Sequence, residues 1–496
     1  MQQGPGAMPW PARLGLAVVL TVAGAGGGYA GVRALTDGAA ASPAHVAHPA
    51  RHASAPQSPA PAASGTPSGG PTAALIPAPA VPAGVSLAAA RAVDPAAPAP
   101  LPAVLAARID AAFSAKALGT RPAGTVVDAL TGAVLYDSAA GVPLVPASTA
   151  KLATATAALV ALGPDARLST RVVDDPAAGT VTIVGGGDPT LTAGAAQPGF
   201  AAARLDDLAR ATVTALRGRG QSKISLRYDA SVFSGPATAA GWKPGYVSDG
   251  NVGRVVGLMV DGGRVQPGRD ARSPDPAAAA AVRFAALLHE RGIAIVGEPR
   301  SGAATGDEIA AVPSPPVKVL VEQMLVHSDN DIAEALARAI AHKTGAPATF
   351  PAGGAAVAAA VAAVGVPGLQ LVDGSGLSRD DRIAPAALAA LVRLATLSAH
   401  PELRPVVAGL PVAGFTGTLA THFGGRATHR FAGVVRAKTG TLAGVTSLAG
   451  TVVDADGRLL VFAFVSNRPA NSPVGTRAPA DGLDVLVAQV AACGCR

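Results

Sequence analysis

The sequence predicts an α/β protein, in which a sheet of short strands is packed by apolar helices. Residues 125–127 and 133–136 are two β-branched or aromatic runs joined by Asp-Ala-Leu-Thr-Gly, which predicts a hairpin. Residues 152–162 are largely apolar and long enough for a buried helix. Further strands are predicted near the end of the chain, at residues 434–439, 445–453 and 459–465.

Composition sets limits on the core and on the partners. The 496 residues are enough for several structural units with a large core. Hydrophobic residues make up 49% of the chain and aromatic residues only 3%, so alanine and valine must fill much of that core. The net charge is +7, but the basic residues are scattered and few aromatic side chains lie among them to stack on bases. We therefore expect no nucleic-acid partner, and a mildly basic surface that suits an anionic cell envelope.

Residues 14–32 form an uncharged run between Arg13 and Arg33. The run is long enough to span a bilayer and long for the apolar region of a signal peptide. It predicts an uncleaved transmembrane anchor, with a cleaved signal peptide as the alternative. Either way the chain is exported to the extracytoplasmic face of the membrane or the cell wall, and an uncleaved anchor leaves residues 1–13 as a short cytoplasmic N-terminus.

Residues 33–100 form a linker that consists mainly of Ala, Pro, Ser, Gly and Thr. Such a segment has too few large apolar side chains to offset the entropy lost on folding, so we expect it to be disordered. Its length suits a tether that holds a catalytic domain away from a membrane surface. Folded sequence is predicted to begin near Leu101.

The stretch Val145-Pro-Ala-Ser-Thr-Ala-Lys151 contains the first candidate for catalysis. Ser148 lies at or near the start of the predicted helix, where unpaired N–H groups and the positive end of the helix dipole favour developing negative charge. Lys151 follows three residues later and therefore lies on the same helix face. A serine hydroxyl needs a neighbour that takes its proton, and a lysine in a partly dry site can do so. Alone, S-x-x-K is common by chance, and a capping serine followed by a solvated lysine is the alternative.

Two further stretches complete a set of three. Ser328-Asp329-Asn330 interrupts a helical segment, and Lys438-Thr439-Gly440-Thr441 follows an apolar run. The order S-x-x-K, S-D-N, K-T-G is the signature of penicillin-binding proteins and serine β-lactamases. Each triplet alone is a weak signal, whereas all three in this order are specific.

Additional stretches make the chain similar to one branch of that superfamily. Residues 185–191 (GGGDPTL), 373–379 (DGSGLSR) and 438–467 resemble the low-molecular-mass class C penicillin-binding proteins, which are D-alanyl-D-alanine carboxypeptidases/endopeptidases of the DacB (S13) family. The similarity runs from about residue 101 to the C-terminus. It implies the penicillin-binding protein/β-lactamase-like transpeptidase fold, with a mostly antiparallel sheet and Lys438 on an edge strand against the Ser148 helix.

The interval between the first two motifs predicts an insertion. Residues 152–327 are far more than compact β-lactamases have there, and class C relatives carry inserted domains in this interval. Strand-like pieces separated by Gly, Pro and Asp occur at residues 171–173, 180–184 and 224–228. Residues 265–276 are too few for a second, nested domain. The resemblance therefore implies one strand-rich insertion at residues 171–304, within a catalytic domain formed by residues 101–170 and 305–496.

The resemblance implies a serine-type D-Ala-D-Ala carboxypeptidase that acts on peptidoglycan stem peptides, is acylated by β-lactams and needs no cofactor or metal. Ser148 would attack the carbonyl carbon and form an acyl-enzyme, with Lys151, kept neutral by burial and nearby cationic charge, as the proton acceptor. Ser328 would relay the proton to the leaving D-alanine. Lys438 would keep the local potential positive, and Asn330 would bind the peptide group of the substrate. Whether the protein also cleaves cross-links as an endopeptidase stays open.

Several residues are expected to bind the substrate. In the K-T-G-T motif, around Gly440, the hydroxyls of Thr439 and Thr441 would bind the terminal carboxylate, and the Thr441 N–H would help to stabilise the oxyanion. By resemblance, Arg379 would bind the side-chain carboxylate of the stem peptide. The acidic partner of this pocket follows a tryptophan in the relatives, but the sequence after Trp242 departs from their pattern. Asp249 is the residue we expect there.

Three other functions are compatible with part of the sequence. A serine β-lactamase uses the same triplets, but no glutamate motif for deacylation is evident and the insertion favours a peptidoglycan enzyme. A catalytically idle envelope scaffold on the same fold is disfavoured because all the catalytic residue types are present. A G-x-S-x-G hydrolase is excluded because Ser148 lacks the flanking glycines. The two cysteines, Cys493 and Cys495, predict either a strained disulfide or two free thiols.

Overall fold

The computed structural model describes residues 92–113, 118, 122–194, 200–266, 269–468 and 477–494. The described residues all belong to one compact unit, Val81–Arg496. The predicted anchor and most of the predicted linker lie outside this part of the chain. Within it, no helix combines the length and the apolar character needed to cross a bilayer.

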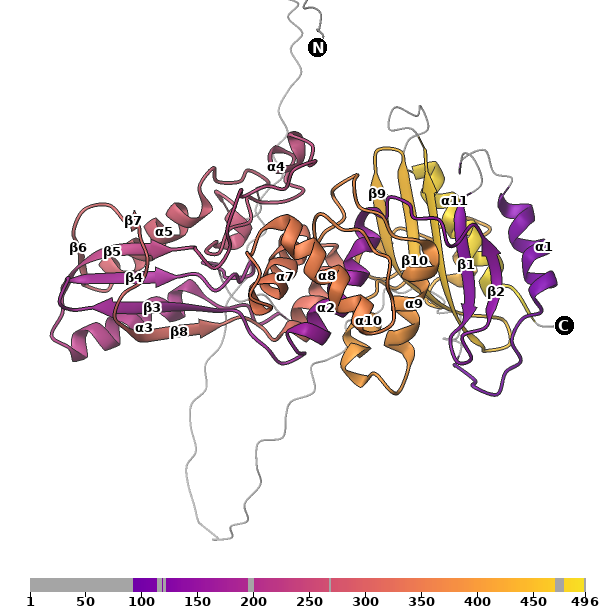
Figure 1. Cartoon of the computed structure of the whole chain (residues 1–496), viewed down its shortest axis with the longest axis horizontal. Helices are drawn as coiled ribbons and strands as arrows, with labels where there is room; N and C mark the ends of the chain where they lie inside the picture. Colours follow the sequence, from indigo (N-terminus) through magenta and orange to yellow (C-terminus); the bar gives the residue numbers. More distant parts are fainter. Residues whose placement is uncertain are drawn as a thin grey trace, which may run out of the picture. The chain divides into compact units, whose positions relative to one another are not determined.

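The first sheet has five antiparallel strands in the order β2-β1-β11-β10-β9 (Figure 1). It confirms the predicted hairpin and the three C-terminal strands. β9 is an edge strand, as the resemblance implied. The bounds are Ala123–Asp128 for β1, Val134–Ser138 for β2, Val435–Leu442 for β9, Val445–Val453 for β10 and Leu459–Asn467 for β11.

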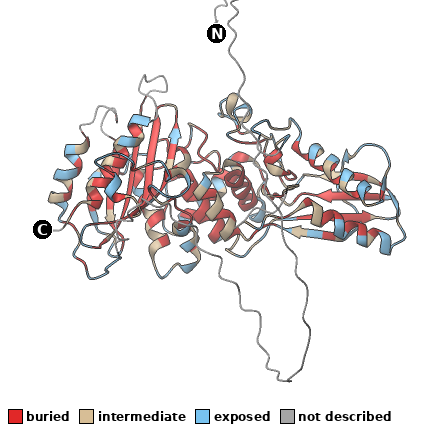
Figure 2. Cartoon of the chain, turned by 180° about the vertical axis from the view of Figure 1, so that it is seen from behind, coloured by how far each residue is buried: buried red, intermediate tan, exposed pale blue. Residues whose placement is uncertain are grey.

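Helices cover both faces of this sheet, so that β10 and most of β11 are buried (Figure 2). Alternate residues of β11 serve different cores, as the period of a strand requires. Phe462 and Phe464 pack with α1 (Pro102–Phe113) and α11 (Arg477–Ala491), whereas Val461 and its alternates join the core of the opposite face. Cys493 is a buried free thiol beyond α11, and Cys495 lies outside the described residues.

The opposite face carries a layer of helices around α2 (Lys151–Ala161), whose residues 151–159 are all buried. This confirms the helix predicted at 152–162. Short alanine side chains let the neighbouring helices approach α2 closely, as the composition implied. The surrounding helices are α6 Val317–His327, α7 Asn330–Lys343, α8 Phe350–Ala363, α9 Pro385–Thr396 and α10 Arg404–Ala408. Single turns of helix lie at α4 Gly245–Ser248, η2 Ala147–Ala150, η3 Asp261–Gly263, η4 Pro401–Leu403, η5 Gly417–Leu419 and η6 His429–Phe431.

A second sheet, in the order β6-β5-β4-β3-β8 with β7 beside β5, occupies the interval predicted to hold an insertion. It packs against α3 (Leu205–Gly218) and α5 (Pro276–Glu290). The sheet runs from Ser169 to Pro313 and so extends beyond the predicted limits of 171 and 304, because β8 pairs with β3. Its strands are β3 Ser169–Asp175, β4 Thr180–Val184, β5 Lys223–Asp229, β6 Ala294–Ile295, β7 Arg300–Ser301 and β8 Asp307–Pro313.

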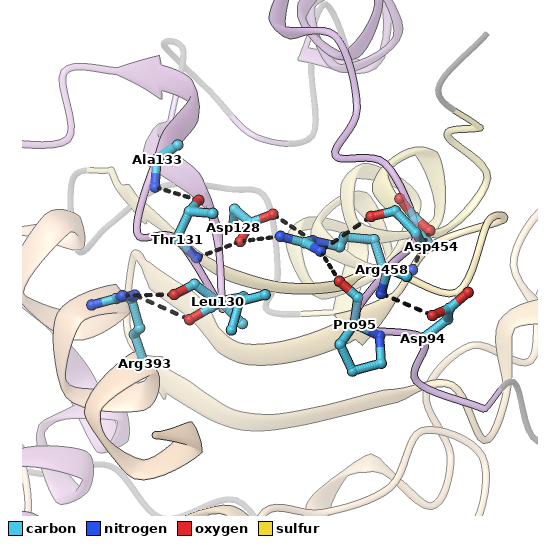
Figure 3. A network of polar contacts seen from close by, with 12 residues as sticks. Asp94, Pro95, Asp128, Leu130, Thr131, Ala133, Arg393, Asp454 and Arg458 are labelled. Atoms are coloured by element: carbon cyan, nitrogen blue, oxygen red, sulfur yellow. Dashed lines mark hydrogen bonds and ion pairs between the residues drawn. The ribbon is translucent and has the colours of Figure 1, made fainter. Parts of the chain in front are cut away.

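A buried ion pair fixes the segment that precedes α1 (Figure 3). Arg458 donates two hydrogen bonds to Asp128, at 2.6 and 3.0 Å, and a third to the carbonyl of Pro95 at 2.6 Å. The Asp94 N–H also donates to the Gly457 carbonyl. Residues 94–97 therefore belong to the folded unit, so the prediction that the linker extends to residue 100 is wrong at this end.

Candidate functional site

Ser148 lies in the single turn η2, directly before α2. The preceding residue, Ala147, has a positive φ of 49°, which is uncommon for a residue with a side chain. The Ala147 carbonyl oxygen packs against Gly376, where a Cβ would lie only 2.0 Å from it. Residue 376 must therefore be glycine for this turn to form. Ser148 is half-buried while its neighbours on both sides are buried. The turn therefore presents one hydroxyl from an otherwise closed surface.

Lys151 is the centre of the hydrogen-bond network. Its Nζ lies 3.1 Å from Ser148 Oγ, 2.6 Å from Asn330 Oδ1 and 2.8 Å from the Ser375 carbonyl oxygen. The last two atoms can only accept hydrogen bonds. A neutral amine has two hydrogens and one lone pair, so these two acceptors take both hydrogens and leave the lone pair for the Ser148 hydroxyl. The geometry thus suits a lysine that accepts the serine proton.

The surroundings of Lys151 make loss of its proton easier than it is in water. Burial lowers the pKa of Lys151 to about 8, although the carboxylates of Glu334, Asp373 and other residues act in the opposite direction. The charged groups that contribute most to this shift are carboxylates, not the cations that we expected. Burial is the cause, and the neighbouring acidic groups limit the shift.

The S-D-N motif separates α6 from α7. Ser328 has a left-handed backbone, with φ at 56°, and the Asp329 side chain caps α7 by accepting from the Ile332 N–H. Asn330 begins α7 and faces Lys151 with its oxygen, while its Nδ2 donates to the Asn251 carbonyl at 2.7 Å. The Asn330 side-chain amide, which the resemblance predicts to bind the substrate, is thus bonded here to a segment of the inserted region.

Lys438 lies on β9, and its Nζ donates to Ser328 Oγ at 2.9 Å and to the Thr439 carbonyl at 2.8 Å. Burial, followed by the charge of Lys151, lowers the pKa of Lys438 well below its usual range. A lowered pKa disfavours the charged form of Lys438, which is contrary to the expectation that its ammonium group is always positive. Gly440 has a packing role, because a Cβ there would lie 2.7 Å from the Pro146 carbonyl oxygen. Only glycine lets β9 approach the serine turn so closely.

The expected substrate-binding residues are less tightly grouped. Thr439 Oγ1 donates to Thr418 Oγ1 at 2.9 Å, and Thr441 is exposed farther along β9. Arg379 donates to the Ala443 carbonyl at 2.6 Å, which places its guanidinium beside the turn that follows β9. Asp249 is exposed at the end of α4, and its side chain bonds locally with Ser248. Among the described residues, no hydrogen bond or ion pair joins Asp249 to Arg379.

Sequence reasoning missed several residues beside the site. Asp373 accepts from the N–H groups of Gly376 and Ser378 and from Trp242 Nε1, and so shapes the D-G-S-G turn. Glu334 is fully buried one helical turn after Asn330. The sequence did contain a signal for Glu334: it lies four residues after Asn330 on a predicted helix, and residues four apart share a helix face.

Comparison with protein families gives a match to the D-Ala-D-Ala carboxypeptidase 3 (S13) family over residues 105–274 and 267–490. The chain is 40% identical over 386 residues to carboxypeptidase DacB of Mycolicibacterium smegmatis, covering 75% of this chain and 80% of that protein. It is 31% identical over 465 residues to a D-alanyl-D-alanine carboxypeptidase of Actinomadura, covering 77% of this chain and 84% of that protein.

The fold is similar to that of a solved structure, penicillin-binding protein 4 (dacB) from Haemophilus influenzae. The TM-score is 0.61 at 22% identity, with 77% of this chain and 98% of that chain covered. The structure of the same protein in complex with a β-lactam has a TM-score of 0.58 at 21% identity, with 77% of this chain and 98% of that chain covered. These likenesses confirm the predicted penicillin-binding fold.

Proposed function

We propose that this chain, which belongs to the D-Ala-D-Ala carboxypeptidase 3 (S13) family, hydrolyses D-Ala-D-Ala peptide bonds through an acyl-enzyme on Ser148. Family membership makes it a serine-type D-Ala-D-Ala carboxypeptidase that acts on peptidoglycan and is acylated by β-lactams. The assignment of the chemistry to Ser148 rests on one observation. Lys151 Nζ lies 3.1 Å from Ser148 Oγ, with its two other contacts made to fixed acceptors.

In the acylation step, Ser148 Oγ attacks the carbonyl carbon while its proton passes to the lone pair of Lys151. The C–O bond forms, the C–N bond to the terminal D-alanine breaks, and the leaving amine needs a proton. Ser328 is suited to relay the proton that Lys151 took from Ser148: its own hydroxyl proton passes to the amine, and the proton from Lys151 replaces it. Its hydroxyl is held for this step by Lys438. That hydrogen bond forms whether Lys438 is charged or neutral, so this positioning does not require a permanent ammonium. Water then hydrolyses the ester and restores Ser148.

We propose that the C-terminal carboxylate of the substrate binds beside β9. Thr439 and Thr441 alternate with Lys438 and Gly440 along the strand, so their hydroxyls lie on the other face of β9. Thr418 supports Thr439 there through a hydrogen bond at 2.9 Å. Arg379 beside the next turn is suited to a second carboxylate, on the stem-peptide side chain. Asp249 is exposed and bonds to Ser248, so its assignment to this pocket rests on the resemblance alone.

The release of D-alanine from a peptide ending in D-Ala-D-Ala tests the proposal. Because the pKa of Lys151 is about 8, the fraction of neutral lysine rises with pH, and the rate of acylation should rise through that range. Full-length Ser148→Ala protein should release no D-alanine at any pH. Release by this variant at the wild-type rate would contradict the assignment of Ser148.

We also propose that residues 14–32 direct the chain to the extracytoplasmic face of the cell membrane. The support is the uncharged run between Arg13 and Arg33, together with a peptidoglycan substrate that lies outside the cytoplasm. Cell fractionation of the full chain should place it in the membrane or outside the cytoplasm. Retention in the cytoplasm would contradict export.

A further inference from the structure

The backbone turn at Gly374–Ser375 is held between α2 and α7. From the α2 side, Thr154 Oγ1 donates to the Gly374 carbonyl at 2.6 Å, and Lys151 Nζ donates to the Ser375 carbonyl at 2.8 Å. From the α7 side, the two oxygens of Glu334 accept the Gly374 N–H at 2.9 Å and the Ser375 N–H at 2.8 Å. The N–H groups of Gly374 and Ser375 are thus held from α7, and their carbonyl groups are held from α2.

Glu334 has no route to solvent and no direct bond to the reacting atoms. Glu334 is fully buried, and its two carboxylate oxygens face the turn rather than Lys151. Among the described residues, the Ser375 carbonyl and Asn330 Oδ1 are the two acceptors that direct the hydrogens of a neutral Lys151. A shift of this carbonyl would rotate the lysine lone pair away from Ser148.

We propose that Glu334 is a positioning residue for Lys151, which fixes the Ser375 carbonyl through the Gly374–Ser375 turn and adds a negative charge that favours the protonated lysine. This rests on the proposed function, in which Lys151 takes the proton of Ser148. α7 then controls the base twice, directly through Asn330 Oδ1 and one helical turn later through Glu334.

The charges around the pair support this role. Burial and the nearby Asp373 raise the pKa of Glu334 to about 8, against the effect of its hydrogen bonds and of Lys151. The two backbone N–H groups and the charge of Lys151 favour the carboxylate form of Glu334. Lys151 also faces Asp373, Asp381 and Asp329, and its charge acts on Lys438, while Glu334 acts on the guanidinium of Arg338. Glu334 is the first of the carboxylates that act on Lys151.

The test is the second-order rate at which a fluorescent penicillin labels the full chain, measured against pH. Glu334→Gln removes the charge and turns an amide NH₂ group toward a backbone N–H. We expect labelling to slow by about 100-fold, the typical effect of a misplaced catalytic group. We also expect the rising limb of the pH profile to move to lower pH, because the charge that holds the proton on Lys151 is lost.

Thr154→Val is the matched control, because it removes a hydrogen bond to the same turn and no charge. If Glu334 were only structural, both variants would slow labelling and leave the pH limb in place, which would overturn the proposal. Labelling of Glu334→Gln at the wild-type rate would also overturn it. Absence of labelling in the wild type would instead contradict the acyl-enzyme itself.

Glu334→Asp keeps the charge and shortens the side chain, and it serves if Glu334→Gln does not fold, as judged by circular dichroism. This variant should label more slowly than the wild type, with its pH limb unmoved. If Glu334→Asp were labelled at the wild-type rate, the contact of the carboxylate with the turn would be unimportant and the proposal would be wrong. If the rising part of its pH profile moved to lower pH, the role of the charge would be contradicted.

Discussion

Replacing Lys151 with methionine is expected to lower the rate of acylation by a β-lactam by about 10²–10⁴-fold, the usual contribution of a general base. Methionine keeps most of the buried volume, so the helical layer around α2 should stay folded. The loss would arise because no lone pair then faces Ser148 Oγ. Stopped-flow labelling with a fluorescent penicillin measures the effect.

Lys318→Met is the control for this variant, because Lys318 is partly exposed on α6 and pairs with Asp165 at the surface. It should label at the wild-type rate. Rapid labelling of Lys151→Met, on protein with an unchanged melting temperature, would contradict the role of Lys151 as proton acceptor.

Replacing Asp128 with asparagine is expected to destabilise the protein by about 3–5 kcal/mol, the usual cost of removing one partner of a buried ion pair. Arg458 would keep its charge in a buried position, with only 8% of its side chain exposed. The same change would weaken the attachment of residues 94–97, which Arg458 also holds through two carbonyls. Thermal unfolding at pH 7 measures the loss.

Acid should remove the same stabilisation. Burial acts to raise the pKa of Asp128, but the hydrogen bonds from Arg458 and Thr131 outweigh it, so this pKa is lowered. The contribution is therefore complete above the unfolded-state pKa, about 3.9, and is lost as pH falls through the lower folded-state value. Asp207→Asn, at an exposed pair with Arg210, should change stability by less than about 1 kcal/mol. Equal melting temperatures for the two variants would contradict the account of Asp128.

Local patterns predicted most of the fold and the catalytic motifs. The hairpin, the buried helix after Ser148 and the edge strand with Lys438 each depend on neighbours in the sequence, so their periodicity and turn residues are readable. The order of the three motifs is the signature of a known superfamily, which implied that the motifs lie together in one site. The structure brings Lys151 to Ser148 and Asn330, and Lys438 to Ser328.

Contacts between distant segments could not be predicted in the same way. Glu334 meets a turn 40 residues away, and Lys151 reaches a carbonyl 224 residues away, through backbone groups that leave no signal in the side-chain sequence. The limits of the second sheet depend on the pairing of β8 with β3, and the attachment of residues 94–97 depends on Arg458. The cause of the Lys151 pKa shift likewise required knowing which charges lie nearby.

Intact-mass spectrometry of the full chain with benzylpenicillin tests the central claim most directly. The account predicts a stable covalent adduct of one penicillin per chain, lost in Ser148→Ala and mapped to the peptide that contains residue 148. An adduct that disappears within seconds would indicate a β-lactamase. A folded wild-type chain that forms no adduct, or a Ser148→Ala variant that still forms one, would contradict catalysis by Ser148.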